Sequence, residues 1–91
     1  MAAKRGGWKA QVKLYVKTWC SWCVTAREWL DARGYRYECI DVEANPADYD
    51  AMIRLSGQKS TPTLVTSDGK VLPDFGTDEL EAFIKKHDLK P

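Results

Sequence analysis

The stretch that decides the fold is VKLYVKTWCSWCVTAREWL, residues 12–30. Apolar residues alternate with polar ones over residues 12–16, which is the pattern of a half-buried strand. From Cys20 onward the apolar positions Cys23, Ala26 and Leu30 recur at helical spacing. The stretch therefore predicts a strand followed by a helix whose first turn holds two cysteines.

A second strand is expected directly downstream of this helix. Gly34 follows the helical pattern and is a typical helix stop. Residues 35–42 are rich in aromatic and β-branched types, which favour a strand. Because a helix-length crossover separates the two strands, we expect them to run parallel, as a βαβ unit.

The C-terminal half predicts a helix, a hairpin and a last helix. Asn45-Pro46 supplies an N-cap and a proline at the first helical position, and this helix is expected to end near Gly57. The turn Ser67-Asp68-Gly69 joins two short strands into an antiparallel hairpin. The acids that follow Gly76-Thr77 suit the first turn of a helix. The predicted order is β-α-β-α-β-β-α.

Size and composition fit a single domain. With 91 residues, 44% of them hydrophobic, the chain is long enough for one core and too short for two. Residues 1–10 contain Gly6-Gly7 and scattered charges and are predicted to be a flexible arm, so the domain is expected to span residues 11–91. A formal charge of +1 offers no global field for nucleic acid or a membrane surface. No stretch is apolar enough to span a bilayer or to act as a signal core, so we expect a cytoplasmic protein.

The motif Cys20-Ser21-Trp22-Cys23 places two thiols one helical turn apart, close enough for a reversible disulfide. At a helix start, free backbone N–H groups and the positive end of the helix dipole favour the Cys20 thiolate and lower its pKa. Cys23 lies on the same face as Ala26 and Leu30 and is therefore expected to be shielded. We predict that Cys20 is the nucleophile and that Cys23 is the resolving thiol.

The other candidate ligands and aromatic residues have simpler interpretations. The alternative interpretation of the cysteine pair is half of a zinc site, which would need two more ligands, and Cys39 and His87 are the only remaining Cys and His; the redox motif explains the pair better, so no metal is predicted. Cys39 lies in a predicted strand, where a free cysteine usually packs as a small buried hydrophobe. His87 lies in the last helical turn, where a cation suits the helix dipole. Trp19 and Trp22 flank the first cysteine and either form an apolar rim around it or pack in the core.

A βαβ unit that opens its first helix with Cys-x-x-Cys, followed by a hairpin entered through Thr61-Pro62, resembles the thioredoxin superfamily. The resemblance covers nearly the whole chain, from Gln11 to His87. It implies a thioredoxin fold, an α/β architecture with a four-stranded mixed sheet flanked by three helices. It also implies that Pro62 is cis and that the backbone of Thr61 pairs with a substrate cysteinyl group. From the sequence alone, Pro62 would be an ordinary trans turn proline.

Within that superfamily the chain resembles the glutaredoxins. Lys17 lies three residues before Cys20, and Gly76-Thr77-Asp78-Glu79-Leu80 is similar to the Gly-x-Asp-Asp-Leu segment of that family. The resemblance implies a glutathione site built from residues that supply a cation, an apolar wall, a backbone partner and a helix N-terminus with an acid. The implied residues are Lys17, Trp22, Thr61, Pro62, Thr77 and Asp78. Taken singly, the lysine could be a solvated strand-end residue and the threonine and aspartate ordinary helix caps.

Some residues depart from the glutaredoxin pattern. The chain has Cys-Ser-Trp-Cys where glutaredoxins commonly have Cys-Pro-Tyr-Cys, and Ser60-Thr61-Pro62 where they have Thr-Val-Pro. Phe75 stands where a glycine often precedes Gly76. Trp19-Cys20 and Pro62-Thr63-Leu64 look more like thioredoxin. These departures concern the electron donor rather than the reaction, because both families use the same two-thiol exchange.

The sequence therefore predicts a glutathione-dependent thiol-disulfide oxidoreductase that serves electron transport and cell redox homeostasis. Through Cys20 and Cys23 it is expected to reduce protein disulfides and glutathione mixed disulfides, as a monomer, with glutathione and such proteins as partners. Two alternatives stay open. One is a thioredoxin-like redoxin reduced by thioredoxin reductase, and the other is a module that binds a [2Fe-2S] cluster through Cys20 and glutathione.

Overall fold

The computed structural model describes residues 12–91, so the predicted arm and the domain start at Gln11 lie outside the described residues. Within them, four strands and three helices alternate in the predicted order. They are β1 (Val12–Val16), α2 (Ser21–Ala32), β2 (Tyr37–Asp41), α3 (Pro46–Ser56), β3 (Thr63–Thr66), β4 (Val71–Pro73) and α4 (Thr77–Lys86).

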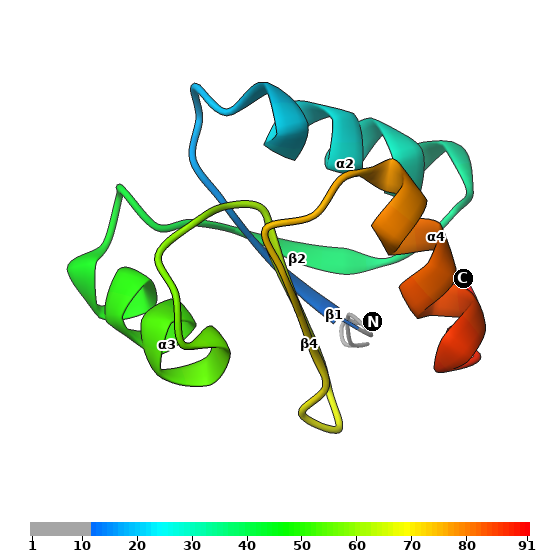
Figure 1. Cartoon of the computed structure of the whole chain (residues 1–91). Helices are drawn as coiled ribbons and strands as arrows, with labels where there is room; N and C mark the ends of the chain where they lie inside the picture. The colour runs from blue at the N-terminus through cyan, green and yellow to red at the C-terminus, as the bar shows by residue number, and fades with distance from the viewer. Residues whose placement is uncertain (1–11) are drawn as a thin grey trace, which may run out of the picture.

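The four strands form one mixed sheet in the order β2-β1-β3-β4. β1 runs parallel to β2, as the crossover predicted, and β3 runs antiparallel to both β1 and β4. In Figure 1 helices α2 and α4 lie on one side of the sheet, and α3 lies on the other. This is the thioredoxin fold.

Local signals in the sequence set the ends of the helices. Asn45 caps α3, since its side-chain oxygen accepts the Ala47 N–H at 3.0 Å, and Pro46 is the first helical residue. Gly57 ends that helix at φ +74°, and Gly34 follows α2 at φ +76°. Residues with a Cβ rarely adopt this left-handed backbone, so glycine is the natural stop at both positions.

Two apolar clusters hold the layers together, one on each face of the sheet. The larger lies between the sheet and the pair α2 and α4, and it includes the fully buried Leu14, Leu30 and Leu80. Burying one such side chain contributes about 1.5–3 kcal/mol. The smaller cluster, under α3, is built from Tyr15, Val42, Met52 and Val65.

Tyr15 and Cys39 differ from the sequence-based expectation in opposite ways. Tyr15 belongs to the strand that was predicted to be half-buried, yet it is 3% exposed, because β1 is a central strand with helices on both faces. The prediction that Cys39 packs in the core is wrong, since it is an exposed free cysteine. It lies in the edge strand β2, beside which the polar Asp31 of α2 accepts a hydrogen bond from the Tyr37 hydroxyl at 2.8 Å.

Candidate functional site

Cys20 lies at the N-terminus of α2 and acts as its N-cap residue. Its backbone is extended (φ −85°, ψ 113°), and the Cys23 N–H donates to its Sγ at 3.2 Å. The side chain is half-buried. The three cysteines are unpaired thiols here, so the geometry is that of the reduced dithiol.

The two cysteines of the motif differ in burial and in pKa. Burial tends to raise the pKa of Cys20, but hydrogen bonds from the side chain and backbone of Cys23, from the Thr61 side chain and from the Trp22 backbone lower it below that of an ordinary thiol. Cys23 is 1% exposed, and its burial is the main cause that raises its pKa to about 11. Cys20 is therefore the thiol that ionises more readily to a thiolate, and Cys23 stays protonated in the reduced protein.

Thr61 and Pro62 lie opposite the cysteine pair, immediately before β3. The peptide bond between them is cis, as the resemblance implied. The Thr61 carbonyl oxygen lies 3.7 Å from Cys20 Sγ and accepts a hydrogen bond from the thiol. Pro62 is buried, whereas Thr61 is half-buried, so the threonine is the residue that faces the reactive sulfur.

Two neighbouring cavities open beside Cys20 and share Trp22 and Glu79 as lining residues. The larger, about 630 Å³, contains the reactive cysteine itself; it is lined by Trp19, Cys20, Ser21, Trp22, Thr61, Asp74 and Glu79. The smaller, about 340 Å³, lies at the N-terminus of α4; it is lined by Trp22, Thr25, Gly76, Thr77, Asp78 and Glu79. A molecule that reaches Cys20 therefore has an adjoining cavity at a helix N-terminus.

Trp22 forms the wall between these cavities by packing on Gly76. A Cβ placed on Gly76 would lie 3.1 Å from the Trp22 ring and equally close to the Glu79 carboxylate. Such contacts are tighter than side chains normally make, so a larger residue here would push the Trp22 ring and the Glu79 carboxylate aside by a few tenths of an ångström. The Gly76 N–H also donates to Glu79 Oε1 at 2.8 Å, which fixes the start of α4.

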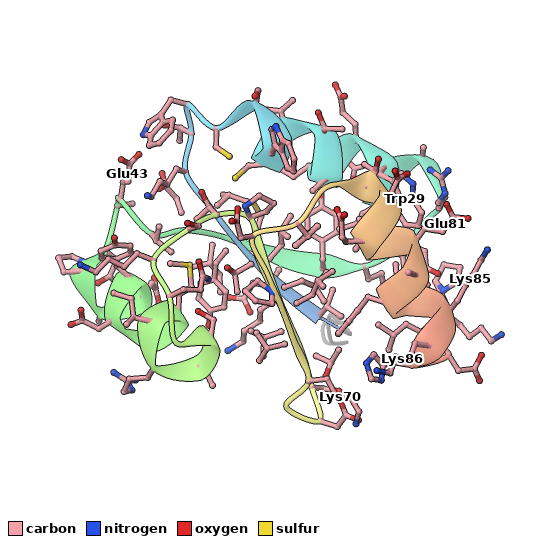
Figure 2. All side chains as sticks on the ribbon, viewed as in Figure 1. Trp29, Glu43, Lys70, Glu81, Lys85 and Lys86 are labelled. Carbon is pink, nitrogen blue, oxygen red and sulfur yellow. The ribbon has the colours of Figure 1, made fainter. Side chains whose placement is uncertain are left out.

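Lys17, the predicted cation of the site, lines neither cavity. Its ammonium lies 5.3 Å from the centroid of the Trp19 ring and 5.7 Å from that of Tyr49. Trp19 is 68% exposed, and its ring N–H donates to Glu43 Oε2 at 2.9 Å. Glu43 follows β2, at the same end of the molecule as the start of α2 (Figure 2).

The sequence profile of the Glutaredoxin family matches residues 12–72, more than half of the chain. The chain belongs to the glutaredoxin family. It is 27% identical to glutaredoxin 3 of Escherichia coli over 82 residues, which cover 90% of this chain and 95% of that protein.

Solved structures share the fold of this chain. The thioredoxin-like protein BC3987 matches this glutaredoxin with a TM-score of 0.71 and 30% identity, over 78% of this chain and 96% of the other. The glutaredoxin of Archaeoglobus fulgidus matches with a TM-score of 0.73 and 23% identity, over 84% and 87% of the two chains. At that identity the second match shows the fold alone.

Six residues that line the cavities of this glutaredoxin are absent from the predicted site: Trp19, Ser21, Thr25, Asp74, Gly76 and Glu79. Glu79 carries a signal in the sequence, because an acid three residues after a helix N-cap commonly bonds back to the cap. Thr25 lies on the exposed side of α2, two residues beyond the motif. Asp74 follows β4 with a left-handed backbone (φ +49°), and no local pattern marks it.

The remaining candidates lie away from the two cavities. His87 ends α4 and packs its ring edge-on against Phe83, with 4.5 Å between the centroids. Within residues 12–91, no three His, Cys, Asp or Glu side chains lie close enough to hold a metal ion. In the same part of the chain, every helix is too short or too polar to cross a membrane.

The unequal cysteines predict unequal alkylation. Iodoacetamide should modify Cys20 first at neutral pH, because its lowered pKa leaves more of it as thiolate. Cys23 should stay unmodified in the folded protein until the pH approaches its pKa of about 11. Mass spectrometry of the modified peptides over a pH series measures both rates. Faster labelling of Cys23 or Cys39 than of Cys20 would show that the nucleophile is misassigned.

Proposed function

We propose that this protein is a glutathione-dependent thiol-disulfide oxidoreductase that reduces protein disulfides and glutathione mixed disulfides. The observation that carries the proposal is the difference between its two cysteines: a half-buried Cys20 with a lowered pKa at a helix N-terminus, and a buried Cys23 directly behind it. One thiol is placed for attack and the other for resolution.

For a glutathionylated protein, the Cys20 thiolate attacks the glutathione sulfur. The bond between Cys20 and glutathione forms while the mixed disulfide breaks, and the protein leaves as a thiolate that takes up a proton. A second glutathione thiolate then attacks the glutathione sulfur on Cys20. The products are oxidised glutathione and the free Cys20 thiolate, so the two electrons come from glutathione.

For a protein disulfide, Cys20 attacks one sulfur and the other leaves as a thiol. Cys23 then loses its proton and attacks the Cys20 sulfur, which releases the second substrate thiol and forms the Cys20–Cys23 disulfide. Two glutathione molecules reduce that disulfide and leave as oxidised glutathione. Because the pKa of Cys23 is about 11 while Cys20 is unlinked, the reduced dithiol carries its thiolate on Cys20.

The cavity at the start of α4 supports glutathione as the donor. Its Trp22 wall adjoins the groove that contains Cys20, and Thr77 and Asp78 begin the helix. Free N–H groups at a helix N-terminus suit the carboxylate of the glutamyl end of glutathione, and the Asp78 carboxylate suits its amine. Lys17 would take the glycyl carboxylate by leaving the rings of Trp19 and Tyr49, contacts worth about 0.5–1 kcal/mol at an exposed site.

A coupled assay tests the electron donor. NADPH consumption is followed with a disulfide peptide as substrate, once with glutathione and glutathione reductase, and once with thioredoxin reductase alone. We expect turnover with the glutathione system and background rates with thioredoxin reductase. The reverse result would replace glutathione by thioredoxin reductase as the donor and leave the dithiol chemistry in place.

Charge reversal should weaken glutathione binding. Lys17→Glu and Asp78→Lys should each raise KM for glutathionylated peptide by about 3- to 10-fold with little change in kcat, because the lost contacts are made in the ground state and both side chains are at least partly exposed. Initial-rate kinetics measure the change.

Matched controls for these two variants lie elsewhere on the surface. Lys70 is at the β3–β4 turn, at the opposite end of the molecule from the start of α2, and Glu81 lies further along α4 (Figure 2). Lys70→Glu and Glu81→Lys should leave KM unchanged. Equal KM values in all four folded variants would mean that Lys17 and Asp78 do not bind glutathione.

A further inference from the structure

The segment between α3 and β3, residues 57–62, carries Thr61 and Pro62 to the reactive thiol. It has no regular secondary structure: backbone hydrogen bonds hold its two ends, from the Gly57 N–H to the Ile53 carbonyl and from the Asp74 N–H to the Pro62 carbonyl, and side-chain hydrogen bonds hold the residues between them. One side chain makes most of them. Gln58 is half-buried and lines neither of the two cavities beside Cys20.

The Gln58 amide binds both backbone groups of Ser60, the residue immediately before Thr61. Its Oε1 accepts the Ser60 N–H at 2.6 Å, and its Nε2 lies 3.3 Å from the Ser60 carbonyl oxygen. A primary amide offers a donor and an acceptor side by side, which matches the two groups of one peptide residue.

The same Nε2 ties this segment to the elements on either side of it. It also lies 3.0 Å from Ser56 Oγ and 3.0 Å from Thr63 Oγ1, so its two N–H groups are shared among three acceptors, the Ser60 carbonyl oxygen included. Ser56 is the last residue of α3, and its hydroxyl donates to the Met52 carbonyl oxygen at 2.7 Å. Thr63 is the first residue of β3, is fully buried, and donates to the Ser60 carbonyl oxygen at 2.8 Å. The Gln58 amide thus links the helix end, the strand start and Ser60.

Ser60, which the Gln58 amide holds, directly precedes the residue that contacts the nucleophile. Thr61 follows Ser60, and its carbonyl oxygen lies 3.7 Å from Cys20 Sγ. We propose that Gln58 is a positioning residue for the dithiol reaction, whose amide fixes Ser60 and so sets the place of Thr61 against Cys20. The inference rests on the proposed function, because it assigns a role within the same site.

The consequence concerns both the thiol and the substrate. The Thr61 side chain is one of the groups that lower the pKa of Cys20, and the backbone of Thr61 faces the groove that a substrate must enter. Releasing Ser60 should therefore make Cys20 less readily ionised and misplace a bound disulfide. A misplacement of about 1 Å costs up to about 10²-fold in rate.

The experiment compares Gln58→Ala and Gln58→Glu with Asn45→Ala. Glutamate keeps the size of the side chain and the acceptor for the Ser60 N–H, but it removes the donors and adds a negative charge. Asn45 caps the other end of α3, and its loss should lower stability without touching the Thr61 segment. All three variants keep the ionisable groups beside Cys20, which are Cys23, Asp74 and Glu79.

The urea unfolding midpoints of the variants are compared first, to show that each variant is folded. Two readouts are then measured: the pH profile of Cys20 alkylation, and kcat/KM for a disulfide peptide. We expect Gln58→Ala to move the alkylation midpoint to higher pH and to lower kcat/KM by about tenfold, and Gln58→Glu to do the same to a smaller extent. Asn45→Ala should leave both readouts unchanged.

A wild-type alkylation profile in the folded Gln58 variants, or equal effects in Asn45→Ala, would overturn the assignment. If Gln58→Ala does not fold, the two readouts of Gln58→Glu decide whether Gln58 is a positioning residue. The alkylation profile needs no electron donor, so it judges Gln58 even if the glutathione assay fails. Absence of turnover in the wild-type protein would count against the proposed function instead.

Discussion

Cys20→Ser should reduce the turnover of both substrate classes to the uncatalysed rate of the thiols in the assay, because it removes the thiolate that makes the first bond. Cys23→Ser should separate the two classes. It should keep deglutathionylation within a few-fold of wild type, since free glutathione can release the Cys20 adduct. Reduction of a protein disulfide should fall by about 10²-fold or more for lack of the intramolecular thiol.

Serine is the suitable replacement for Cys23. The Cys23 N–H that donates to Cys20 Sγ belongs to the backbone and survives the change, and the new hydroxyl still offers a donor to the sulfur. The two activities are measured on a glutathionylated peptide and on insulin. Cys39→Ser is the control, and because Cys39 is exposed we expect neither stability nor turnover to change. Equal loss of deglutathionylation in Cys23→Ser and Cys20→Ser would contradict the monothiol route and favour a strictly dithiol mechanism.

Phe75→Ala should cost about 3–5 kcal/mol of unfolding free energy, the usual range for emptying a buried aromatic position. Phe75 is 1% exposed and packs in the cluster that also holds Cys23 and Leu80. Since small domains have only about 5–15 kcal/mol in total, this single change should remove a large share of the stability. Urea denaturation followed by tryptophan fluorescence measures the loss.

The control for this prediction is Val24→Ala in α2. Val24 is 45% exposed, so its truncation should change the unfolding free energy by no more than about 0.5 kcal/mol. Phe75 directly precedes Gly76, the N-cap of α4. Because its loss should loosen the start of α4, the variant should also weaken glutathione binding. A loss of unfolding free energy below about 1 kcal/mol in Phe75→Ala would mean that the larger apolar cluster accommodates the truncation, contrary to the prediction from its burial.

Most of the fold was predictable because its signals are local. Alternation over residues 12–16, the cap at Asn45-Pro46 and the stops at Gly34 and Gly57 act between residues at most a few positions apart. Each therefore leaves its mark in the sequence itself. The order of elements, the parallel pairing of β1 with β2 and the hairpin after Thr61-Pro62 follow from such signals.

The cysteine pair was predictable for the same reason, because the spacing within Cys20-Ser21-Trp22-Cys23 and the helix that follows it determine which thiol faces outward. The structure confirms that Cys23 is buried and that the pKa of Cys20 is lowered. The roles of Lys17, Thr77 and Asp78 stay predictions, since they depend on a ligand rather than on the fold.

Only the tertiary structure decided the features that depend on strand order and on contacts far apart in the sequence. The sheet order places β2 at an edge, which exposes Cys39, and places β1 at the centre, which buries Tyr15. The packing of Trp22 on Gly76 brings two distant segments so close together that a Cβ on Gly76 would lie 3.1 Å from the Trp22 ring. The sequence by itself determined the elements, their order and the reactive motif, because these depend on short-range propensity. Which side chains surround that motif depends on how the layers pack, and no local pattern records it.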